Sequence, residues 1–433
     1  MPEAVDRVHH FAQRHASWFV LVLLFLAGPR TLGAQSVDLL IQGGHVIDPA
    51  NQIDQVMDVA ISDGKIARVG ENLSGLSSDR VVDATGLYVT PGLIDLHVHS
   101  FWGTDYERTS DGINALAPDG FTFRAGVTTV VDVGGSGWID FLTFKDRVID
   151  RSKTRVLSFL QIVKYGQKGT PYVQSTGNMD PEMAAERAQQ FPEHIVGFKL
   201  AHYSGHDWEP VERVTRAGEL AGLPVMIDFG GATPPLPLET LFMEKLRPGD
   251  IYTHAFGGQH DADLTGSGRQ AIVDEEFQLR PFIADAVERG IVFDVGHGAG
   301  SFFYKQAIPA MEQGFRPTTI STDLYGSSMN TGMMNMTNVM SKFLDLGMTL
   351  QEVIEASTWK TAQVLSRREL GNLTEGAEAD VTILRLEEGT FGFVDSAGLR
   401  KNSDQKLTAE LTIRAGEVVW DLNGLAADPY VRN

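Results

Sequence analysis

The sequence predicts an α/β protein built on a (β/α)8 barrel of the TIM type, with a small β-sandwich formed by both chain ends. Three observations support this. Continuous apolar runs recur through the middle of the 433-residue chain, amphipathic segments separate several of them, and both ends alternate apolar and polar residues. Uninterrupted apolar runs are typical of parallel strands buried on both faces. Strand–helix alternation repeated about eight times favours a barrel.

The two ends of the chain have the same pattern of apolar and polar residues. "VDLLIQGGHVIDP" and "MDVAISDGKIARVG" near the start, and "GAEADVTILRLEEG" near the end, alternate in the manner of strands, with "SDGK" as a tight-turn signal. We therefore assign residues 35–90 and 368–433 to one composite sandwich domain, and residues 91–367 to a catalytic barrel inserted between them.

Eight runs in the middle read as barrel strands. They lie at residues 88–99, 126–135, 154–163, 194–203, 223–231, 249–258, 290–298 and 317–326. Helical segments between and after them include "DWEPVERVTRAGELAG" and a stretch that opens with Thr349 and Glu352, which have the spacing of a capping box.

The first 34 residues form a different segment. Arg7 and Arg14 precede the apolar run "WFVLVLLFLAG", and small residues follow at Gly33 and Ala34. This is the layout of a secretory signal peptide, and it predicts export to the periplasm or the extracellular space. A membrane anchor is the alternative, but the run is shorter than the roughly 20 apolar residues that a span requires.

The amino-acid composition limits which classes of partner and which metal ligands we expect. The formal charge of −20 disfavours nucleic acid and anionic membranes, and we expect a small-molecule substrate and no stable membrane association after signal removal. Homo-oligomer formation stays open. Because the chain has no cysteine, a metal would be held by nitrogen and oxygen donors alone.

Polar residues fall at the ends of the predicted strands, where barrel enzymes place their chemistry. They are His97, His99, Lys199, Asp228, His254, His297 and Asp323.

Three of these strand ends suggest a metal site from residue chemistry alone. His97 and His99 are two apart, so both side chains point to one face of a strand, as a ligand pair would. Lys199 lies inside the apolar stretch "GFKLA", where burial depresses the pKa of an amine. It either forms a buried ion pair, for instance with Asp323, or takes up carbon dioxide as a carbamate able to bridge two metals. Asp323 follows the uncharged "TTIST" and needs a partner such as a metal, lysine or substrate.

This ordered set resembles the amidohydrolase superfamily. The resemblance rests on "PGLIDLHVHS", Lys199, "RPGDIYTHAF", "FDVGHGAGSF", "ISTDLYG" and the closing "GAEADVTIL", and it covers roughly residues 37–425. The branch that the sequence is most similar to is that of dihydroorotase-like amidohydrolase and deacetylase proteins.

The resemblance implies two divalent metal ions, with zinc as the metal. His97, His99 and Asp323 would hold the more buried ion, a carbamate on Lys199 would bridge both ions, and His254 would hold the second. A hydroxide shared by the metals would attack a carbonyl carbon, and Asp323 would act as the catalytic residue that passes the proton to the leaving group.

One position departs from the family pattern. The fifth strand usually ends in a histidine ligand, and here the candidate is Asp228 in "VMIDFGG". Asp228 either binds the second metal or binds none and leaves a mononuclear site, in which case His202 or His206 completes the metal shell or binds substrate. We interpret His297, between glycines in "DVGHGAG", as a substrate contact.

These features predict a metal-dependent hydrolase that cleaves an amide, a cyclic amide or an activated ester of a small molecule. Two alternatives are an N-acyl amino acid deacetylase, for which no carboxylate-binding cation can be assigned from sequence, and a catalytically inactive exported protein that binds a metal or another ligand.

Overall fold

The fold is described from a computed structural model. It covers residues 36–101, 112, 114–167, 170–228, 231–258 and 268–431. The predicted signal peptide lies outside these residues. Within them, no helix combines the length and apolar character that a membrane crossing requires.

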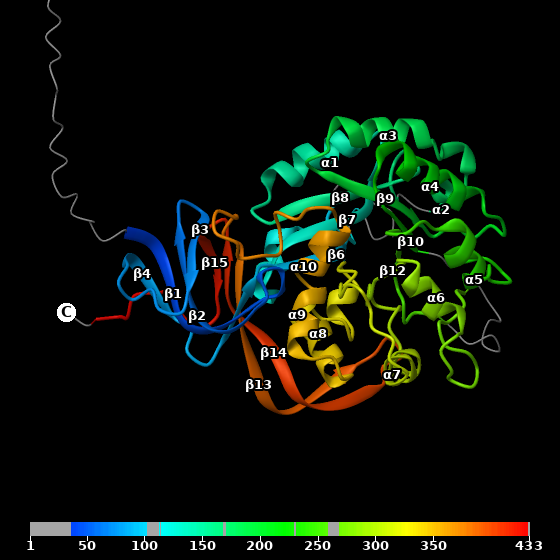
Figure 1. Ribbon diagram of the computed structural model, residues 1–433. Coiled ribbons are helices and arrows are strands. Elements are labelled where there is room, and N and C mark those ends of the chain that lie inside the picture. Colours follow the sequence, from blue (N-terminus) through cyan, green and yellow to red (C-terminus); the bar gives the residue numbers. More distant parts are fainter. Residues whose placement is uncertain are drawn as a thin grey trace, which may run out of the picture. The chain divides into compact units, whose positions relative to one another are not determined.

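Strands from both chain ends form one eight-stranded sheet (Figure 1). The N-terminal part supplies β1 (Ser36–Asp48), β2 (Ile53–Ser62), β3 (Lys65–Gly70), β4 (Ser77–Asp83) and β5 (Tyr88–Pro91), and the C-terminal part supplies β13 (Val381–Val394), β14 (Arg400–Arg414) and β15 (Glu417–Asp421). Antiparallel pairing of β13 with β5 joins the two ends. The "SDGK" turn joins β2 to β3, with positive φ at Asp63 and Gly64 as a type I′ turn requires.

The barrel sheet consists of seven parallel strands in sequence order. They are β6 (Leu93–Val98), β7 (Val127–Gly137), β8 (Arg155–Gln161), β9 (Ile195–Ala201), β10 (Val225–Asp228), β11 (Ile251–Tyr252) and β12 (Val292–Phe293). The fold class is therefore confirmed, together with the sheet built from both ends.

The eighth predicted strand, residues 317–326, is irregular but closes the barrel. On one side Val295 N donates to Thr319 O at 3.1 Å, and on the other His99 N donates to Leu324 O at 2.9 Å. The segment thus lies between the β12 side and β6, and it carries Asp323 to the centre.

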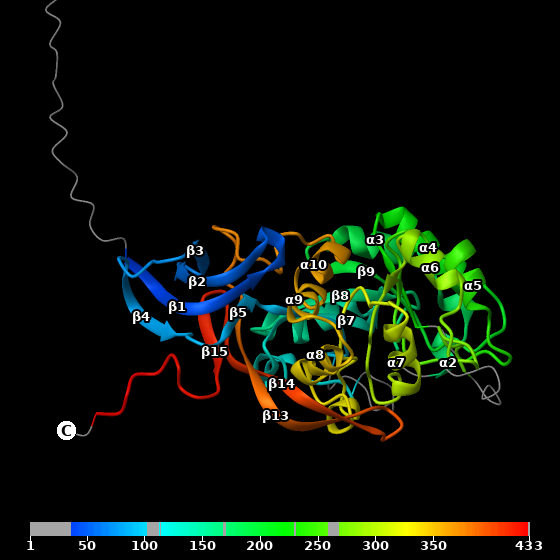
Figure 2. The same cartoon turned by 60° about the horizontal axis from the view of Figure 1, so that its bottom comes forward.

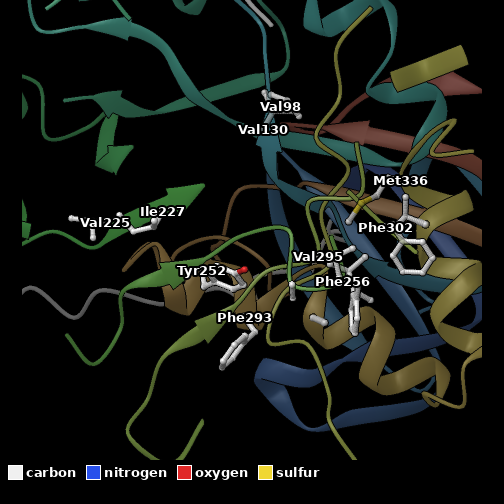
Figure 3. Close-up of a cluster of buried hydrophobic side chains, with 14 of the residues drawn as sticks. Val98, Val130, Val225, Ile227, Tyr252, Phe256, Phe293, Val295, Phe302 and Met336 are labelled. Carbon is white, nitrogen blue, oxygen red and sulfur yellow. The ribbon is translucent and has the colours of Figure 1, made fainter. Parts of the chain in front are cut away.

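Helices surround the barrel strands. They are α1 (Phe141–Arg147), α2 (Thr170–Val173), α3 (Pro181–Gln190), α4 (Glu209–Ala221), α5 (Leu238–Thr240), α6 (Phe282–Glu288), α7 (Tyr304–Glu312), α8 (Met336–Asp345), α9 (Leu350–Ala356) and α10 (Trp359–Val364). The capping box of Thr349 and Glu352 starts α9, as predicted. Figure 3 shows part of one large buried cluster, to which Val98, Ile227, Tyr252 and Phe293 of the strand region belong together with Phe256, Phe302 and Met336.

The β13–β14 hairpin is longer than a sandwich needs. Figure 2 shows it passing beside α8, where Leu407 N donates to Ser341 Oγ at 2.9 Å. Its far end reaches α7, where Tyr304 N donates to Asp395 Oδ2 at 3.0 Å. The hairpin therefore braces the barrel from the C-terminal part of the chain.

A second connection lies where the sheet from the chain ends meets the barrel. Glu378 and Asp380 form ion pairs with Arg155 of β8 and Arg414 of β14. Arg155 bonds Asp380 at 2.7 Å and Glu378 at 2.9 Å, with both guanidinium groups mostly buried. These charges connect strands that are far apart in the chain.

Candidate active site

The polar strand ends meet at one end of the barrel. His97 lies in β6 and His99 directly follows it, Lys199 lies in β9, Asp228 ends β10, and His254 follows β11. Each of these side chains is buried, as is that of Asp323. His254 and Asp323 have positive φ values of 62° and 52°, which non-glycine residues adopt rarely, aspartate and histidine more often than most.

His97, His99 and Asp323 form a compact group of ligand atoms. Their ligand atoms all lie within 4.8 Å of one another, and no other group of three histidines or carboxylates among the described residues meets this distance. Asp323 Oδ1 lies 3.1 Å from His99 Nε2 and 3.5 Å from His97 Nε2. Two imidazole nitrogens and a carboxylate oxygen converging in this way are a donor set that suits a divalent metal such as zinc.

A hydrogen bond at Nδ1, the ring nitrogen that does not face Asp323, fixes the orientation of the His97 ring. Thr253 Oγ1 donates its proton to Asp294 Oδ2 at 2.7 Å, so it must accept the contact of 2.9 Å from His97 Nδ1. Nδ1 therefore carries the hydrogen, and the Nε2 lone pair faces Asp323. Burial and the nearby Lys199 charge hold the pKa of His97 well below its usual range, which keeps the ring neutral as a ligand must be.

Two buried carboxylates, not singled out from the sequence, position the Asp323 segment. Asp95 accepts from Thr322 Oγ1 at 2.5 Å and from Thr322 N at 3.0 Å. Asp294 accepts from Thr319 Oγ1 at 2.7 Å and Ser321 Oγ at 2.8 Å. The available signal was an aspartate inside each apolar run, "LIDLHVH" and "GIVFDVG".

Lys199 is surrounded by carboxylates yet has a depressed pKa. Burial lowers the pKa of its amine to about 8, against the opposing attraction of Asp228 and Asp323. Its Nζ lies 3.4 Å from Met226 Sδ. A neutral amine is the form that reacts with carbon dioxide, so the surroundings of Lys199 fit a carbamate.

Asp228 has a partner that sequence reasoning missed. Arg269 Nη2 donates to Asp228 Oδ1 in a short charge-assisted bond, while Oδ2 lies 3.4 Å from His202 Nε2 and 3.5 Å from His254 Nε2. Burial alone would raise the pKa of Asp228, but Arg269 and His254 hold it well below its usual range. Arg269 stands in the loop after β11, away from any strand end, so strand periodicity gave no signal for it.

The two candidate substrate residues lie in different settings. His202 is 52% exposed beside Asp228, and His206 is exposed in the same loop. His297 is buried, with Nδ1 2.9 Å from Gly298 O and Nε2 2.6 Å from Lys342 Nζ. Both ring nitrogens of His297 thus already contact protein groups, and His202 is the better placed of the two predicted substrate contacts.

His254 is oriented by the same segment that contains His297. Its Nδ1 lies 2.5 Å from Gly296 O. A carbonyl only accepts, so Nδ1 carries a hydrogen, and Nε2 faces Asp228 Oδ2. The barrel end therefore presents two groups, the His97–His99–Asp323 set and the pair of Asp228 with Arg269 next to His254.

Comparison with known proteins places these groups in context. The model of the amidohydrolase family matches residues 304–419. A deacetylase of Brucella anthropi is 33% identical over 80% of this chain and 83% of its own length, and a deacetylase of Agrobacterium fabrum is 33% identical over 78% and 80%. Crystal structures of an adenine deaminase and a dihydroorotase have TM-scores of 0.79 and 0.76 at 27% and 29% identity, covering 89% and 88% of this chain and 100% and 99% of theirs.

Proposed function

Because the chain belongs to the amidohydrolase superfamily, we propose that it is a metal-dependent hydrolase that cleaves the carbon–nitrogen bond of an amide or cyclic amide in a small molecule. The observation that carries this is the buried His97–His99–Asp323 group, whose ligand atoms lie within 4.8 Å of one another. We assign zinc to it, because zinc is commonly held by imidazole and carboxylate donors. A metal bound there supplies Lewis acidity and lowers the pKa of water to about 7.

The protein groups then have distinct roles. Asp323 Oδ1 faces both histidines, which leaves Oδ2 to accept a proton from the attacking water and return it to the leaving nitrogen. Thr253 and Asp294 hold His97 in the ligating tautomer. Lys199, as a carbamate, adds a carboxylate-like oxygen ligand to the site.

A second, narrower candidate is the deacetylation of N-acyl amino acids. Its support is Arg269, whose side chain is 14% exposed and whose Nη1 is buried with no hydrogen-bond partner among the described residues. A buried guanidinium nitrogen without a partner is costly, and a substrate carboxylate would satisfy it. Two relatives that are named deacetylases agree with this candidate.

The test is a substrate screen on the purified chain supplied with zinc and bicarbonate. The substrates are N-acyl amino acids, O-acyl hydroxy acids, and cyclic ureides and imides. We expect turnover of an amide or cyclic amide, and its loss in Asp323→Asn, which removes both a metal ligand and the proton acceptor. The absence of turnover with bound metal verified would favour a ligand-binding protein without catalysis.

We also propose that the chain is exported and that residues 1–34 are removed. The basic and then apolar layout of the N-terminus supports this. Expression of the full chain followed by N-terminal sequencing of the periplasmic and culture fractions tests the proposal. An intact N-terminus on a membrane-bound product would contradict it.

A further inference from the structure

The Asp228 carboxylate is fully engaged by neighbouring protein groups. Oδ1 accepts from Arg269 Nη2, and Oδ2 lies 3.4 Å from His202 and 3.5 Å from His254. Asp228 is 6% exposed. Its charge is therefore already neutralised by a guanidinium in a place that water screens poorly.

A second metal at the end of β10 would need the same carboxylate. It would also lie next to the Arg269 guanidinium, which stays protonated at any ordinary pH. Two positive charges at this separation repel strongly when both are buried. A histidine, as the resemblance implies for this position, is uncharged when it ligates and would hold no arginine in this way. The pairing of Asp228 with Arg269 is therefore more favourable than binding of a second metal ion to Asp228 next to the same arginine.

We propose that Arg269 takes the place of a second metal ion on Asp228, so that the site holds one divalent metal at His97, His99 and Asp323. This inference rests on the metal site of the proposed function but not on the identity of the substrate. It makes the guanidinium a permanent positive charge at the end of β10. Asp228 is then a residue that positions Arg269 and not a metal ligand.

The donor set at the end of β10 is smaller than the set at His97, His99 and Asp323. Gly296 O accepts the Nδ1 hydrogen, and Nε2 lies 3.5 Å from Oδ2 of the carboxylate that Arg269 neutralises. Among the described residues, the ligand atoms of His254 and Asp228 do not join a third histidine or carboxylate within the 4.8 Å that His97, His99 and Asp323 satisfy. The His97–His99–Asp323 set therefore offers three close ligands, whereas the end of β10 offers Asp228 and His254 with a guanidinium already bound to the carboxylate.

Metal stoichiometry tests the proposal without a substrate. The full chain is loaded with zinc and bicarbonate, dialysed, and its metal counted by inductively coupled plasma mass spectrometry. The same is done for the Asp228→His/Arg269→Ala double variant, which restores the family's usual histidine and removes the competing cation. Arg316→Ala serves as the matched control, because that guanidinium donates to the Met311 and Phe315 carbonyls away from the site.

One equivalent in the wild type and the Arg316→Ala control, with a second equivalent gained by the double variant, supports the proposal. Two equivalents in the wild type overturn it, and so does a single equivalent in both chains. No bound metal in any chain would contradict the metal site of the proposed function as well.

A second measurement needs only the wild type, in case the double variant does not fold. The protein is loaded with manganese and its electron paramagnetic resonance spectrum is recorded. A resolved hyperfine pattern of an isolated ion is the expected result. The broadened spectrum of an exchange-coupled pair would overturn the proposal.

Discussion

Lys342 on α8 connects three separate parts of the chain behind the site, and replacing it tests how the site is supported. Its buried Nζ donates to Gly332 O at 2.6 Å and to Val394 O at 2.9 Å, and it contacts His297 Nε2 at 2.6 Å. The acceptors belong to the loop after Asp323, to β13 and to the segment after β12. Lys342→Met keeps the length and apolar stem of the side chain but removes all three contacts.

The magnitude follows from two opposing terms. Hydrogen bonds from a charged donor contribute about 1.5–3 kcal/mol each, whereas burying the ammonium costs several kcal/mol that methionine does not incur. Burial lowers the pKa of Lys342 to about 7, so the comparison is made at about pH 6, where the amine is charged. We expect Lys342→Met to lower the free energy of unfolding by about 2–4 kcal/mol.

Urea unfolding of the wild type, Lys342→Met and the exposed control Lys360→Met measures this. The control should stay within about 0.5 kcal/mol of the wild type. Catalytic activity should fall with stability in Lys342→Met, because the His297 segment also supplies the Gly296 carbonyl that orients His254. A loss of less than about 1 kcal/mol, with activity intact, would refute the supporting role of Lys342.

Three further perturbations follow from the same contacts. Gly298→Ala places a Cβ 2.3 Å from Asp323 Oδ2, and Gly298 has a φ of +53° that alanine adopts rarely. Hydrolytic activity should therefore fall at least about tenfold. Gly300→Ala, which has open space around its Cβ, should keep near wild-type activity in the same assay. Lys199→Ala should lose bound metal and activity and regain part of both when propionate is added, and full activity without it would contradict the carbamate. The arginines that pair with Glu378 hold its pKa below its ordinary value of 4.5, against the raising effect of burial. The stability that Glu378 contributes is therefore present above pH 4.5 and is lost as the pH falls below that value. Thermal unfolding should show a wild-type advantage over Glu378→Gln that holds at neutral pH and shrinks below about pH 4.5, and an advantage that stays constant there would contradict the ion pairing.

The barrel could be predicted from sequence because its strands are buried on both faces. "GVTTVVDVGG" and "HIVGFKLAHY" have no solvent-facing side, so neither shows the alternation of apolar and polar residues that a half-exposed strand has. The run ending at Asp323 was identified by the same logic, although it forms an irregular segment and not a regular strand. Buried side-chain acceptors such as Asp95 and Asp294, and not a full backbone ladder, hold that segment in place.

The long β13–β14 hairpin was not foreseen. Its outer part, near Glu387 and Phe391, carries many exposed residues and has no core-facing alternation to announce it. Its role becomes visible only when Val394 and Asp395 are seen bonding Lys342 and Tyr304 of the barrel. Contacts between elements so distant in the chain leave no periodic signal in either one.

Arg269 shows why the candidate site could be predicted only in part. Periodicity located Asp228 at a strand end, and the chemistry of a carboxylate allowed either a metal or a cation as its partner. The partner comes from a loop whose sequence, "GSGRQ", has no pattern that relates it to β10. Only the fold brings the guanidinium onto Asp228 Oδ1. Asp228, which stands where the resemblance implies a histidine, left the number of metals open in the sequence. The structure gives this aspartate a physical reason, because its carboxylate holds the positively charged Arg269 and a neutral histidine could not.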